Sequence, residues 1–355
     1  MPERDVGKIV VVRANALGDY VFALPALDAL RATYPLAEIV LLGAPWHARF
    51  LTGRPGPVDR VVELPPLPGI RAPGDADPAP FLAAMRAERF DLAVQMHGGG
   101  RYTNPLVAAL GARITAGLRA EDAPPLDRWL RYVYYQPEVF RYLELVGLVG
   151  ARPVGYRPVL TPTDDDRKEA AAVVPDGDRP LAVLHPGATD NRRRWPAQRF
   201  SAVGDALADV ADVLVTGTGA ERALVERVVA GMRRPGRPLV DALSLGGLAG
   251  LLARAGVVVS NDTGPVHLAE AVGAPTVGLY WVGNLINGAP ADRARHRPLI
   301  SWTIHCPECG ADCTRDLYPA RRAGDRAGCP HSPSFVADIA TVEVVDAARE
   351  LLGES

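Results

Sequence analysis

Short apolar runs alternate with longer amphipathic stretches along most of this 355-residue chain. Lys8–Arg13 and Glu38–Gly43 are β-favouring runs, and Val21–Tyr34 between them carries apolar residues at helical spacing. The same order of strand, helix and strand recurs further along the chain. Because strands that are joined through a helix lie parallel with right-handed crossovers, this alternation predicts α/β units built on parallel sheets.

The predicted elements fall into two sets, separated by a segment rich in proline and aspartate between Arg157 and Arg179. Further strands are predicted at 58–64, 91–96, 180–185, 212–216, 257–259 and 276–280, and further helices at 80–89, 197–208, 220–232 and 248–253. A chain of this length exceeds what one hydrophobic core usually holds. We therefore predict two doubly wound domains, at 1–160 and 179–335, joined by a hinge at 161–178.

The overall charge is nearly balanced, with 39 basic and 41 acidic residues and a formal net charge of −2. A nucleic-acid binder normally shows a basic domain or stripe, so this class of partner is not expected. The apolar runs stay shorter than the ~18 residues that a membrane span needs, and the polar segment Met1–Lys8 does not resemble a signal peptide. We expect a cytoplasmic protein, with peripheral contact to a membrane left open.

The turn Asn15-Ala-Leu-Gly-Asp19 follows the first predicted strand directly. Gly18 permits a tight turn, and Asp19 falls at the carboxyl edge of the strand, where side chains face a ligand site rather than the core. A carboxylate there can act as a general base toward a substrate hydroxyl. The alternative is that Asp19 only caps the helix that follows.

A second turn, His185-Pro-Gly-Ala-Thr189, leads into Arg192-Arg-Arg-Trp-Pro196. A glycine turn, the Thr189 hydroxyl and three arginines ahead of a helix suit a pyrophosphate group. The alternative is a solvated basic turn against which Trp195 packs.

Two more polar turns follow predicted strands of the second set. In Thr216-Gly-Thr-Gly-Ala-Glu221 the glycines allow close approach, and Glu221 could accept hydrogen bonds from ribose hydroxyls; an ordinary strand-to-helix turn is the alternative. Asn261-Asp-Thr-Gly264 ends a buried strand and begins a helix that carries His267, so free backbone N–H groups lie beside a carboxylate and a hydroxyl. Capping alone would explain Asp262. Because strand ends in this fold face one edge, the recurrence of such turns predicts a ligand site.

His97-Gly-Gly-Gly100 follows a predicted strand of the first set. Three glycines in a row destabilise a fold unless the backbone must approach something closely. We name Asn15, His97, Gly98 and Gly99 as candidates on the acceptor side of the site. His47 and His296 are expected at the surface.

All four cysteines, Cys306, Cys309, Cys313 and Cys329, lie within the segment 305–331. The pattern Cys-Pro-x-Cys-Gly is typical of a metal knuckle, and Cys313 with Cys329 or a histidine could complete a tetrahedral site. The expected metal is zinc, with an iron–sulfur cluster as the alternative. A loop of free thiols or a redox pair is the interpretation without metal.

Three of these motifs, in this order, resemble glycosyltransferase family 9, the bacterial ADP-heptose:lipopolysaccharide heptosyltransferases and their relatives. They are Lys8–Asp19 with Ala23-Leu-Pro-Ala-Leu27, His185-Pro-Gly-Ala with Arg193-Arg-Trp-Pro196, and Asn261-Asp-Thr-Gly-Pro-Val-His-Leu268. The resemblance implies the GT-B fold, with two Rossmann-like domains across a cleft and a final helix, here at 340–355, that returns to the N-terminal domain. It also implies that the N-terminal domain binds the acceptor and the C-terminal domain binds the nucleotide sugar.

The implied activity is inverting transfer of a heptose from ADP-heptose to an acceptor hydroxyl, without a cofactor. Asp19 matches the catalytic base of the family. The implied donor-binding residues are Thr189, Arg193, Thr216, Glu221, Asp262, Thr263, Gly264 and His267. One position departs from the family pattern, because Arg193 stands where a lysine is usual. Arginine keeps the positive charge but cannot donate a proton at neutral pH, so Arg193 is expected to act by charge.

Several alternatives remain open at this point. The acceptor could be the lipopolysaccharide core or a small metabolite such as an antibiotic precursor, since lipopolysaccharide-directed members tend to be basic and this chain is not. The same fold also serves nucleotide-sugar epimerases, which convert the donor without an acceptor, and non-catalytic binders of nucleotide sugars.

Overall fold

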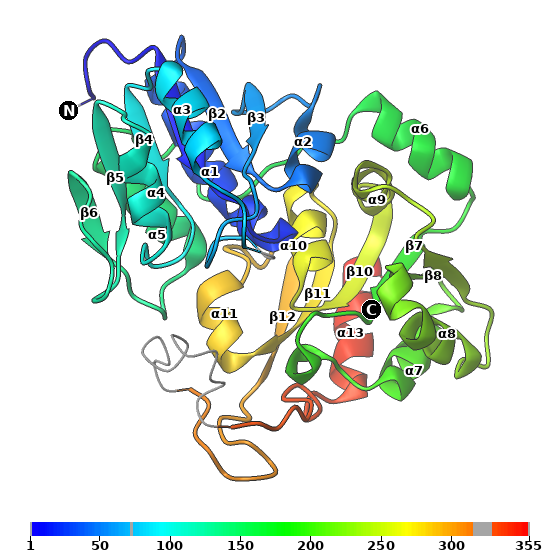
Figure 1. Cartoon of the computed structure of the whole chain (residues 1–355). Helices are drawn as coiled ribbons and strands as arrows, with labels where there is room; N and C mark the ends of the chain where they lie inside the picture. The colour runs from blue at the N-terminus through cyan, green and yellow to red at the C-terminus, as the bar shows by residue number, and fades with distance from the viewer. Residues whose placement is uncertain (1, 72–73, 315–328, 354–355) are drawn as a thin grey trace. The chain divides into compact units, whose positions relative to one another are not determined.

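The computed structural model describes residues 2–71, 74–314 and 329–353 of the chain. It divides into two compact units, Met1–Thr161 and Pro162–Ser355, so the boundary falls at the start of the expected hinge (Figure 1). Residues 315–328 of the predicted cysteine-containing region and residues 354–355 of the predicted last helix lie outside the described residues. Each unit is an α/β unit on one parallel sheet.

The first unit contains one six-stranded sheet in the order β3-β2-β1-β4-β5-β6. Its elements are β1 (Lys8–Val12), α1 (Leu17–Thr33), β2 (Glu38–Gly43), α2 (Pro45–Leu51), β3 (Arg60–Glu63), α3 (Ala79–Ala87), β4 (Leu92–Gln95), α4 (Thr103–Ala109), β5 (Ile114–Arg119), β6 (Arg128–Arg131) and α5 (Glu138–Gly147). Ile9–Val12 in the centre of this sheet are fully buried, as expected for a strand that is covered on both faces.

The direction of winding reverses between β1 and β4 in this sheet. The chain first extends the sheet from β1 to β2 and β3, and it then returns to the other side of β1 through β4. The loops that follow β1 and β4 therefore diverge at the carboxyl edge, which is where doubly wound folds bind ligands.

The second unit also contains a six-stranded sheet, in the order β12-β11-β10-β7-β8-β9. Its elements are α6 (Asp164–Val173), β7 (Leu181–His185), η1 (Asn191–Arg193), α7 (Ala197–Leu207), β8 (Asp212–Gly217), η2 (Gly219–Glu221), α8 (Arg222–Ala230), β9 (Arg237–Val240), α9 (Leu245–Leu252), β10 (Ala255–Asn261), α10 (Gly264–Ala271), β11 (Thr276–Trp281), α11 (Val282–Gly288), β12 (His296–Ser301) and α13 (Thr341–Leu352). Here the winding reverses between β7 and β10, so the loops after these two strands mark the switch point.

The last helix, α13, packs on α7, β10 and β11 of the second unit. Its buried residues Val344, Ala347 and Ala348 belong to the hydrophobic core of that unit. That this helix returns to the N-terminal domain, as the resemblance implied, stays a prediction, and its described contacts lie within the second unit. The physical reason is its apolar face, which completes the core beneath β10.

Two local expectations are wrong. His47 is fully buried in α2, and His296 is 3% exposed at the start of β12, so neither is a surface histidine. Nδ1 of His47 accepts a hydrogen bond from the backbone N–H of Ala44, and Nδ1 of His296 lies 2.9 Å from the hydroxyl of Thr276. One nitrogen of each ring is thus engaged, while Nε2 of His47 is buried without a hydrogen-bond partner among the described residues.

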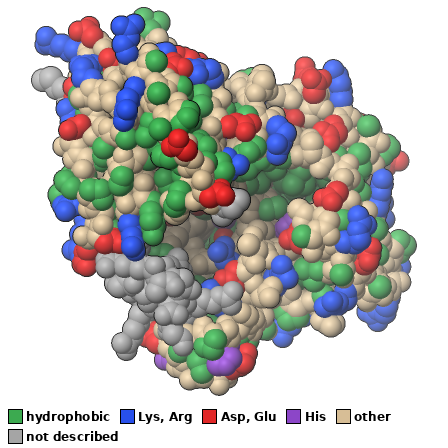
Figure 2. Space-filling model, in the orientation of Figure 1, with side chains coloured by type: hydrophobic (Ala, Val, Ile, Leu, Met, Phe, Trp, Pro, Cys, Tyr) green, Lys and Arg blue, Asp and Glu red, His purple; other side chains and the backbone are tan. Residues whose placement is uncertain are grey.

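The surface carries both signs of charge. On the face that Figure 2 shows, Lys and Arg side chains are interspersed with Asp and Glu side chains, in line with the near-balance of 39 basic and 41 acidic residues. Among the helices of the described residues, none is long and apolar enough to cross a lipid bilayer.

Candidate functional site

Asp19 lies at the switch point of the first unit, in the first turn of α1. The helix begins at Leu17, earlier than the sequence predicted, so the Asp19 carboxylate reaches back over the turn after β1. Its Oδ2 accepts from the backbone N–H of Ala16 at 3.1 Å, which is the capping role, and its Oδ1 accepts from Arg13 at 3.0 Å. The side chain remains 36% exposed. Asp19 therefore caps the helix and still presents a carboxylate to solvent.

Arg13, the residue after β1, fixes the position of Asp19 and was not recognised in the sequence. Its side chain is 2% exposed, and its Nε donates to the backbone carbonyl of Asp19 at 2.9 Å. A second carboxylate, Glu138 at the start of α5, lies 3.5 Å from the guanidinium. Because the arginine is buried and charged, these partners hold it in one place, and through it the Asp19 carboxylate.

His97 follows β4 and lies beside the same turn. Its Nδ1 accepts from the backbone N–H of Ala14 at 3.2 Å. Burial, and then the nearby charge of Arg13, lower the pKa of His97 to about 3. The ring is therefore neutral near pH 7 and carries its proton on Nε2, which makes it a hydrogen-bond donor.

The glycines after His97 have reasons within the fold. Gly98 and Gly100 adopt φ values of +65° and +93°, a region that other residues rarely enter. A Cβ on Gly100 would also approach the carbonyl oxygen of Leu118 within 2.5 Å. Nearby, Oδ1 of Asn15 is buried without a hydrogen-bond partner among the described residues. The expected acceptor-side residues thus lie on the two loops that flank the switch point.

In the second unit, Asn261 joins the loops that follow β7 and β10. Its Nδ2 donates to the carbonyl of Pro186 at 2.8 Å, and its Oδ1 accepts from the backbone N–H of Trp195 at 3.0 Å. Trp195 itself is buried and donates from Nε1 to the carbonyl of Ile339. The loop after β7 and the turn after β10, which lie 65 or more residues apart in the sequence, are therefore hydrogen-bonded to each other at the switch point.

The three arginines of the η1 turn have different roles. Arg192 donates from Nε to both carboxylate oxygens of Asp190 at 3.0 Å, and Arg194 donates to the carbonyl of Ala188. Both therefore shape the turn. Arg193 is 42% exposed and approaches Oδ2 of Asp262 at 3.3 Å. Of the three, Arg193 is thus the cation that lies beside the loop after β10.

Asp262 organises this loop. It is 5% exposed, and its Oδ2 also accepts from Nδ2 of Asn284 at 2.7 Å, while its Oδ1 lies 3.0 Å from Nε2 of His267. Burial opposes ionisation, but His267 and Arg193 outweigh it and hold the pKa of Asp262 below its usual value. Both oxygens are thus engaged by protein groups, so the carboxylate arranges its neighbours rather than standing free.

The loop ends in the N-terminus of α10. Thr263 is the N-cap residue, with extended backbone and no capping hydrogen bond from its side chain, and Gly264 begins the helix. Both residues are partly exposed. Pro265 has no N–H and the N–H of Val266 donates to the carbonyl of Thr263, so the N–H of Gly264, the Thr263 hydroxyl and the positive end of the helix dipole are what this turn offers to an anion.

The remaining donor-side predictions meet varied surroundings. Thr216 is 4% exposed, and its hydroxyl lies 3.1 Å from Nδ1 of the buried His185. Glu221 accepts from the backbone N–H of Thr218 at 2.9 Å. Its Oε1 would lie 1.9 Å from a Cβ on Gly187, so any side chain at position 187 would displace this carboxylate. Thr189 is exposed on the same loop. Thr216 is thus a packing residue, and Glu221 lies over the loop after β7.

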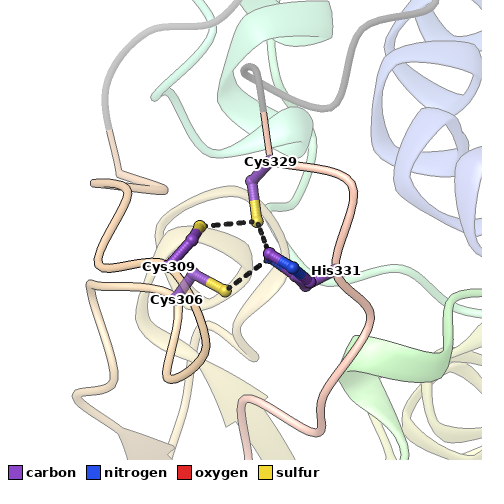
Figure 3. Close-up of side chains that lie close together, drawn as sticks. All are labelled: Cys306, Cys309, Cys329 and His331. Atoms are coloured by element: carbon purple, nitrogen blue, oxygen red, sulfur yellow. Dashed lines mark hydrogen bonds between the residues drawn. The ribbon is translucent and has the colours of Figure 1, made fainter.

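Three cysteines and a histidine converge in the loops after β12 (Figure 3). The ligand atoms of Cys306, Cys309, Cys329 and His331 all lie within 4.8 Å of one another. Sγ of Cys309 is 3.5 Å from Sγ of Cys329, and Nδ1 of His331 is 3.8 Å from Sγ of Cys306 and 3.7 Å from Sγ of Cys329. Cys313 is not part of this group, since its thiol donates to the carbonyl of Ala311.

The backbone around Cys306 has the form of a knuckle. Gly310 takes a φ of +69° and donates its N–H to the carbonyl of Cys306 at 2.8 Å. Burial opposes ionisation of the Cys306 thiol, but the N–H groups of Cys309 and Glu308 and the neighbouring thiols lower its pKa to about 7. Nε2 of His331 faces the carboxylate of Glu308 at 3.6 Å, the outer partner that metal-binding histidines usually have.

Sequence reasoning missed four polar residues at these places: Arg13, Glu138, Glu270 and Asn284. Glu270 had a readable signal, because it stands three residues after His267 on a predicted helix. Arg13 and Asn284 carried no signal of their own, since each meets its partner only when the chain is folded.

Comparisons with known proteins agree with this architecture. The model of the family "Glycosyltransferase family 9 (heptosyltransferase)" matches residues 80–297. The lipopolysaccharide core heptosyltransferase OpsX of Haemophilus influenzae is 22% identical over 294 residues, which cover 79% of this chain and 81% of that protein. The structure of E. coli ADP-heptose lipopolysaccharide heptosyltransferase II is similar with a TM-score of 0.75 at 18% identity, covering 98% of this chain and 99% of that one.

A further similar structure is that of TibC, an iron-containing dodecameric heptosyltransferase in complex with ADP-D-beta-D-heptose. Its TM-score is 0.55 at 12% identity, and the match covers 99% of this chain and 77% of TibC. Both structural matches show the fold, which is GT-B. Since the family model covers more than half of the sequence, the chain belongs to glycosyltransferase family 9, the heptosyltransferase family.

Proposed function

We propose that this protein transfers a heptose from ADP-heptose to an acceptor hydroxyl, with inversion at the anomeric carbon. The observation that carries the proposal is the set of charged and polar groups at the switch points of the two sheets. One holds a partly exposed carboxylate, Asp19, pinned by a buried arginine, and the other holds a helix N-terminus with Arg193 beside it. A base and an anion site are the two parts that glycosyl transfer from a nucleoside diphosphate requires.

The donor assignment rests on the second unit. The start of α10 offers the N–H of Gly264 and the Thr263 hydroxyl to a diphosphate, and the Arg193 guanidinium supplies positive charge. Glu221 over Gly187 is the carboxylate that we assign to the ribose hydroxyls. ADP-heptose is the first candidate because the names of similar solved structures contain it.

In the proposed reaction, Asp19 takes the proton of the acceptor hydroxyl as its oxygen attacks the anomeric carbon. The bond between that carbon and the diphosphate oxygen breaks at the same time, and its electron pair leaves with ADP. The transition state has the oxocarbenium character of other glycosyl transfers. Arg193 and the helix N-terminus stabilise the charge that grows on the diphosphate, and arginine does so without giving up a proton.

The acceptor follows from the family relatives, whose names include lipopolysaccharide core heptosyltransferase. We take a saccharide of the lipopolysaccharide core type as the first acceptor and the cytoplasm as the place of reaction. If the acceptor is a small metabolite instead, ADP release should stay absent with the core saccharide and appear only when a hydroxylated metabolite that the protein accepts is added.

The test is an assay of ADP release from ADP-heptose, with and without a core saccharide. Wild-type protein should release ADP only with acceptor, and Asp19→Asn should lose at least about 100-fold in kcat, as expected for loss of a general base, while ADP binding stays unchanged. Asp164→Asn is a matched control, because that carboxylate is 89% exposed on α6. Full turnover by Asp19→Asn would refute the role of the base. Conversion of ADP-heptose to an isomer without acceptor would show an epimerase instead.

We further propose that Cys306, Cys309, Cys329 and His331 hold one metal ion with a structural role. A tetrahedral zinc site separates its sulfur ligands by about 3.8 Å and its sulfur and nitrogen ligands by about 3.6 Å, as bond lengths near 2.3 and 2.1 Å require. The three separations of 3.5 to 3.8 Å are close to these values, and the four ligand atoms all lie within 4.8 Å of one another. The compact set suits a single ion better than an iron–sulfur cluster, whose ligands bind different irons.

Zinc is the first candidate, and iron is the second because TibC is described as iron-containing. Elemental analysis of the purified protein should find about one metal ion per chain. Cys309→Ser should lose it, whereas Cys313→Ser, in which the altered thiol lies outside the group, should keep it. A metal-free wild-type protein purified without chelators would refute the proposal.

A further inference from the structure

His267 lies between two carboxylates inside the second unit. Nε2 of its ring is 3.0 Å from Oδ1 of Asp262, and its Nδ1 is 3.4 Å from Oε2 of Glu270. The ring is 3% exposed. Ionised carboxylates only accept hydrogen bonds, so a ring that bonds to one on each side carries a proton on both nitrogens. The geometry is therefore that of an imidazolium.

Glu270 is itself held in place. It stands one helical turn after His267 on α10, with its side chain 11% exposed, and its Oε1 accepts from the hydroxyl of Tyr280 on β11 at 3.2 Å. Burial, with Glu270 and Asp262 nearby, raises the pKa of Tyr280 well above its usual value, so this residue stays a neutral donor. Burial alone would lower the pKa of His267, but the two carboxylates raise it to about 9.

These groups form a chain that reaches the proposed diphosphate site: Arg193, Asp262, His267, Glu270 and Tyr280. Arg193 and a protonated His267 carry two positive charges, Asp262 and Glu270 carry two negative charges, and Tyr280 is neutral. The net charge of this chain of groups is therefore zero. With a neutral His267 the sum would be −1, beside the helix start where a diphosphate would bind.

Three elements of the described residues pack closely on α10. β10 ends at Asn261 and is followed directly by Asp262, β11 contributes Tyr280, and α9, with the sequence Leu-Gly-Gly-Leu-Ala-Gly-Leu-Leu, contains no titratable group. Asn284 of α11 and Arg193 of η1 approach Asp262 from outside the helix.

We propose that Glu270 is a positioning residue for the loop after β10, which contains Asp262 and Thr263. Glu270 keeps His267 an imidazolium against Asp262, so that this loop presents no net negative charge to a nucleoside diphosphate. The idea rests on the proposed function for its ligand. It assigns a role to a carboxylate that does not touch the ligand and that acts only through His267.

The first test measures the charge of His267 directly. Side-chain 15N NMR of the full chain, with the His267 signals assigned by their loss in His267→Gln, should show both ring nitrogens protonated at pH 7.5. In Glu270→Gln the glutamine amide oxygen can still accept from Nδ1 but carries no charge, so the ring should lose its proton at a pH at least one unit lower. Glu226→Gln, a 60% exposed carboxylate on α8, is the control and should leave the titration unchanged.

The second test measures ADP binding by isothermal titration calorimetry between pH 6.5 and 8.5. Wild-type affinity should vary little, whereas Glu270→Gln should lose about tenfold at the alkaline end, the effect of one unit charge roughly 10 Å away in a partly screened site. Equal melting temperatures of wild type and Glu270→Gln at pH 6.5 would separate this loss from unfolding.

The results that would overturn this proposal differ from the result that would overturn the proposed function. A neutral His267 in the wild type at pH 7.5, or an unchanged titration in Glu270→Gln, would overturn the proposal. So would a shifted titration without any change in the pH dependence of ADP affinity. If the wild type bound no ADP at any pH, the proposed function would fail, whereas the NMR titration would still report on the link between Glu270 and His267.

Discussion

Acidification from pH 7 to pH 5 should destabilise the first unit, because its two histidines, the buried His47 and the half-buried His97, are neutral in the folded state. Burial lowers the pKa of His47 to about 3, with Arg13 adding to the effect. Burial followed by Arg13 does the same for His97. The unfolded chain takes up these protons near pH 6.5, whereas the folded unit does not. Stability is therefore present above pH 6.5 and is lost progressively as the pH falls toward 3.

The size of the effect follows from these pKa values. At pH 5 each histidine is about 1.5 units below its unfolded pKa, which corresponds to about 2 kcal/mol, and the two together to about 4 kcal/mol. Because His97 is only partly buried and solvent screens its charge, we take about 3 kcal/mol as the lower value for the total loss of stability at pH 5. Either figure is a large share of the 5–15 kcal/mol that roughly bounds the stability of a domain.

The assay is urea unfolding at the two pH values, followed by hydrogen exchange of peptides from β1 and β2, which reports on the first unit separately. The matched variant is His47→Asn with His97→Asn. An asparagine oxygen can accept the backbone N–H bonds that Nδ1 of each ring accepts from Ala44 and Ala14. The variant starts less stable, because ring packing is lost, but its stability should fall by much less between pH 7 and 5. An equal fall in both proteins would refute the reasoning.

Three further predictions concern the site. Gly187→Ala should weaken ADP binding with little change in melting temperature, because the new methyl group displaces Glu221, whose Oε1 would lie 1.9 Å away. Arg13→Lys should lower kcat while the KM for the donor is unchanged, since a lysine cannot hold both the carbonyl and the carboxylate of Asp19; an unchanged kcat would show that Arg13 does not position Asp19. Arg193→Lys should keep most of the ADP affinity and Arg193→Ala should lose about tenfold of it by calorimetry, as an electrostatic role requires.

Most central strands of the two sheets could be predicted from local patterns. Strands such as β1 and β10 are continuous apolar runs, and a run of this kind identifies a strand that is buried on both faces without knowledge of its neighbours. β5, β6, β9 and β12 were not predicted. β6, β9 and β12 are edge strands without an unbroken buried apolar run, and β6 and β9 carry exposed residues such as Trp129 and Arg237. In the central strand β5, Thr115 and Gly117 interrupt the apolar residues. Helix α1 starts four residues before its predicted start at Val21, since its first turn carries the polar Asp19.

Some residues of the two candidate sites could likewise be predicted from local sequence, and others could not. Asp19 and Asp262 could be named in advance because a polar residue at the end of a buried strand is unusual wherever it occurs. The roles of their partners could not. Arg13 stands among strand residues and meets Glu138 across 125 positions of sequence, and Asn284 meets Asp262 across 22. His47 lies under Trp46 and Tyr20, so its burial depends on packing that no local pattern encodes.

The sequence by itself determined the fold class, the two-unit division, the family and the loops that carry polar side chains, because each of these depends on residues that are close together in the chain. The tertiary structure decided which side chains and elements are partners. It assigned Asp262 to Arg193, Asn284 and His267, placed His331 rather than Cys313 among the clustered thiols, and joined α13 to the second unit. Electrostatic and packing partners are fixed by distance in space, and the crossovers of a doubly wound sheet bring strand ends together irrespective of their separation along the chain.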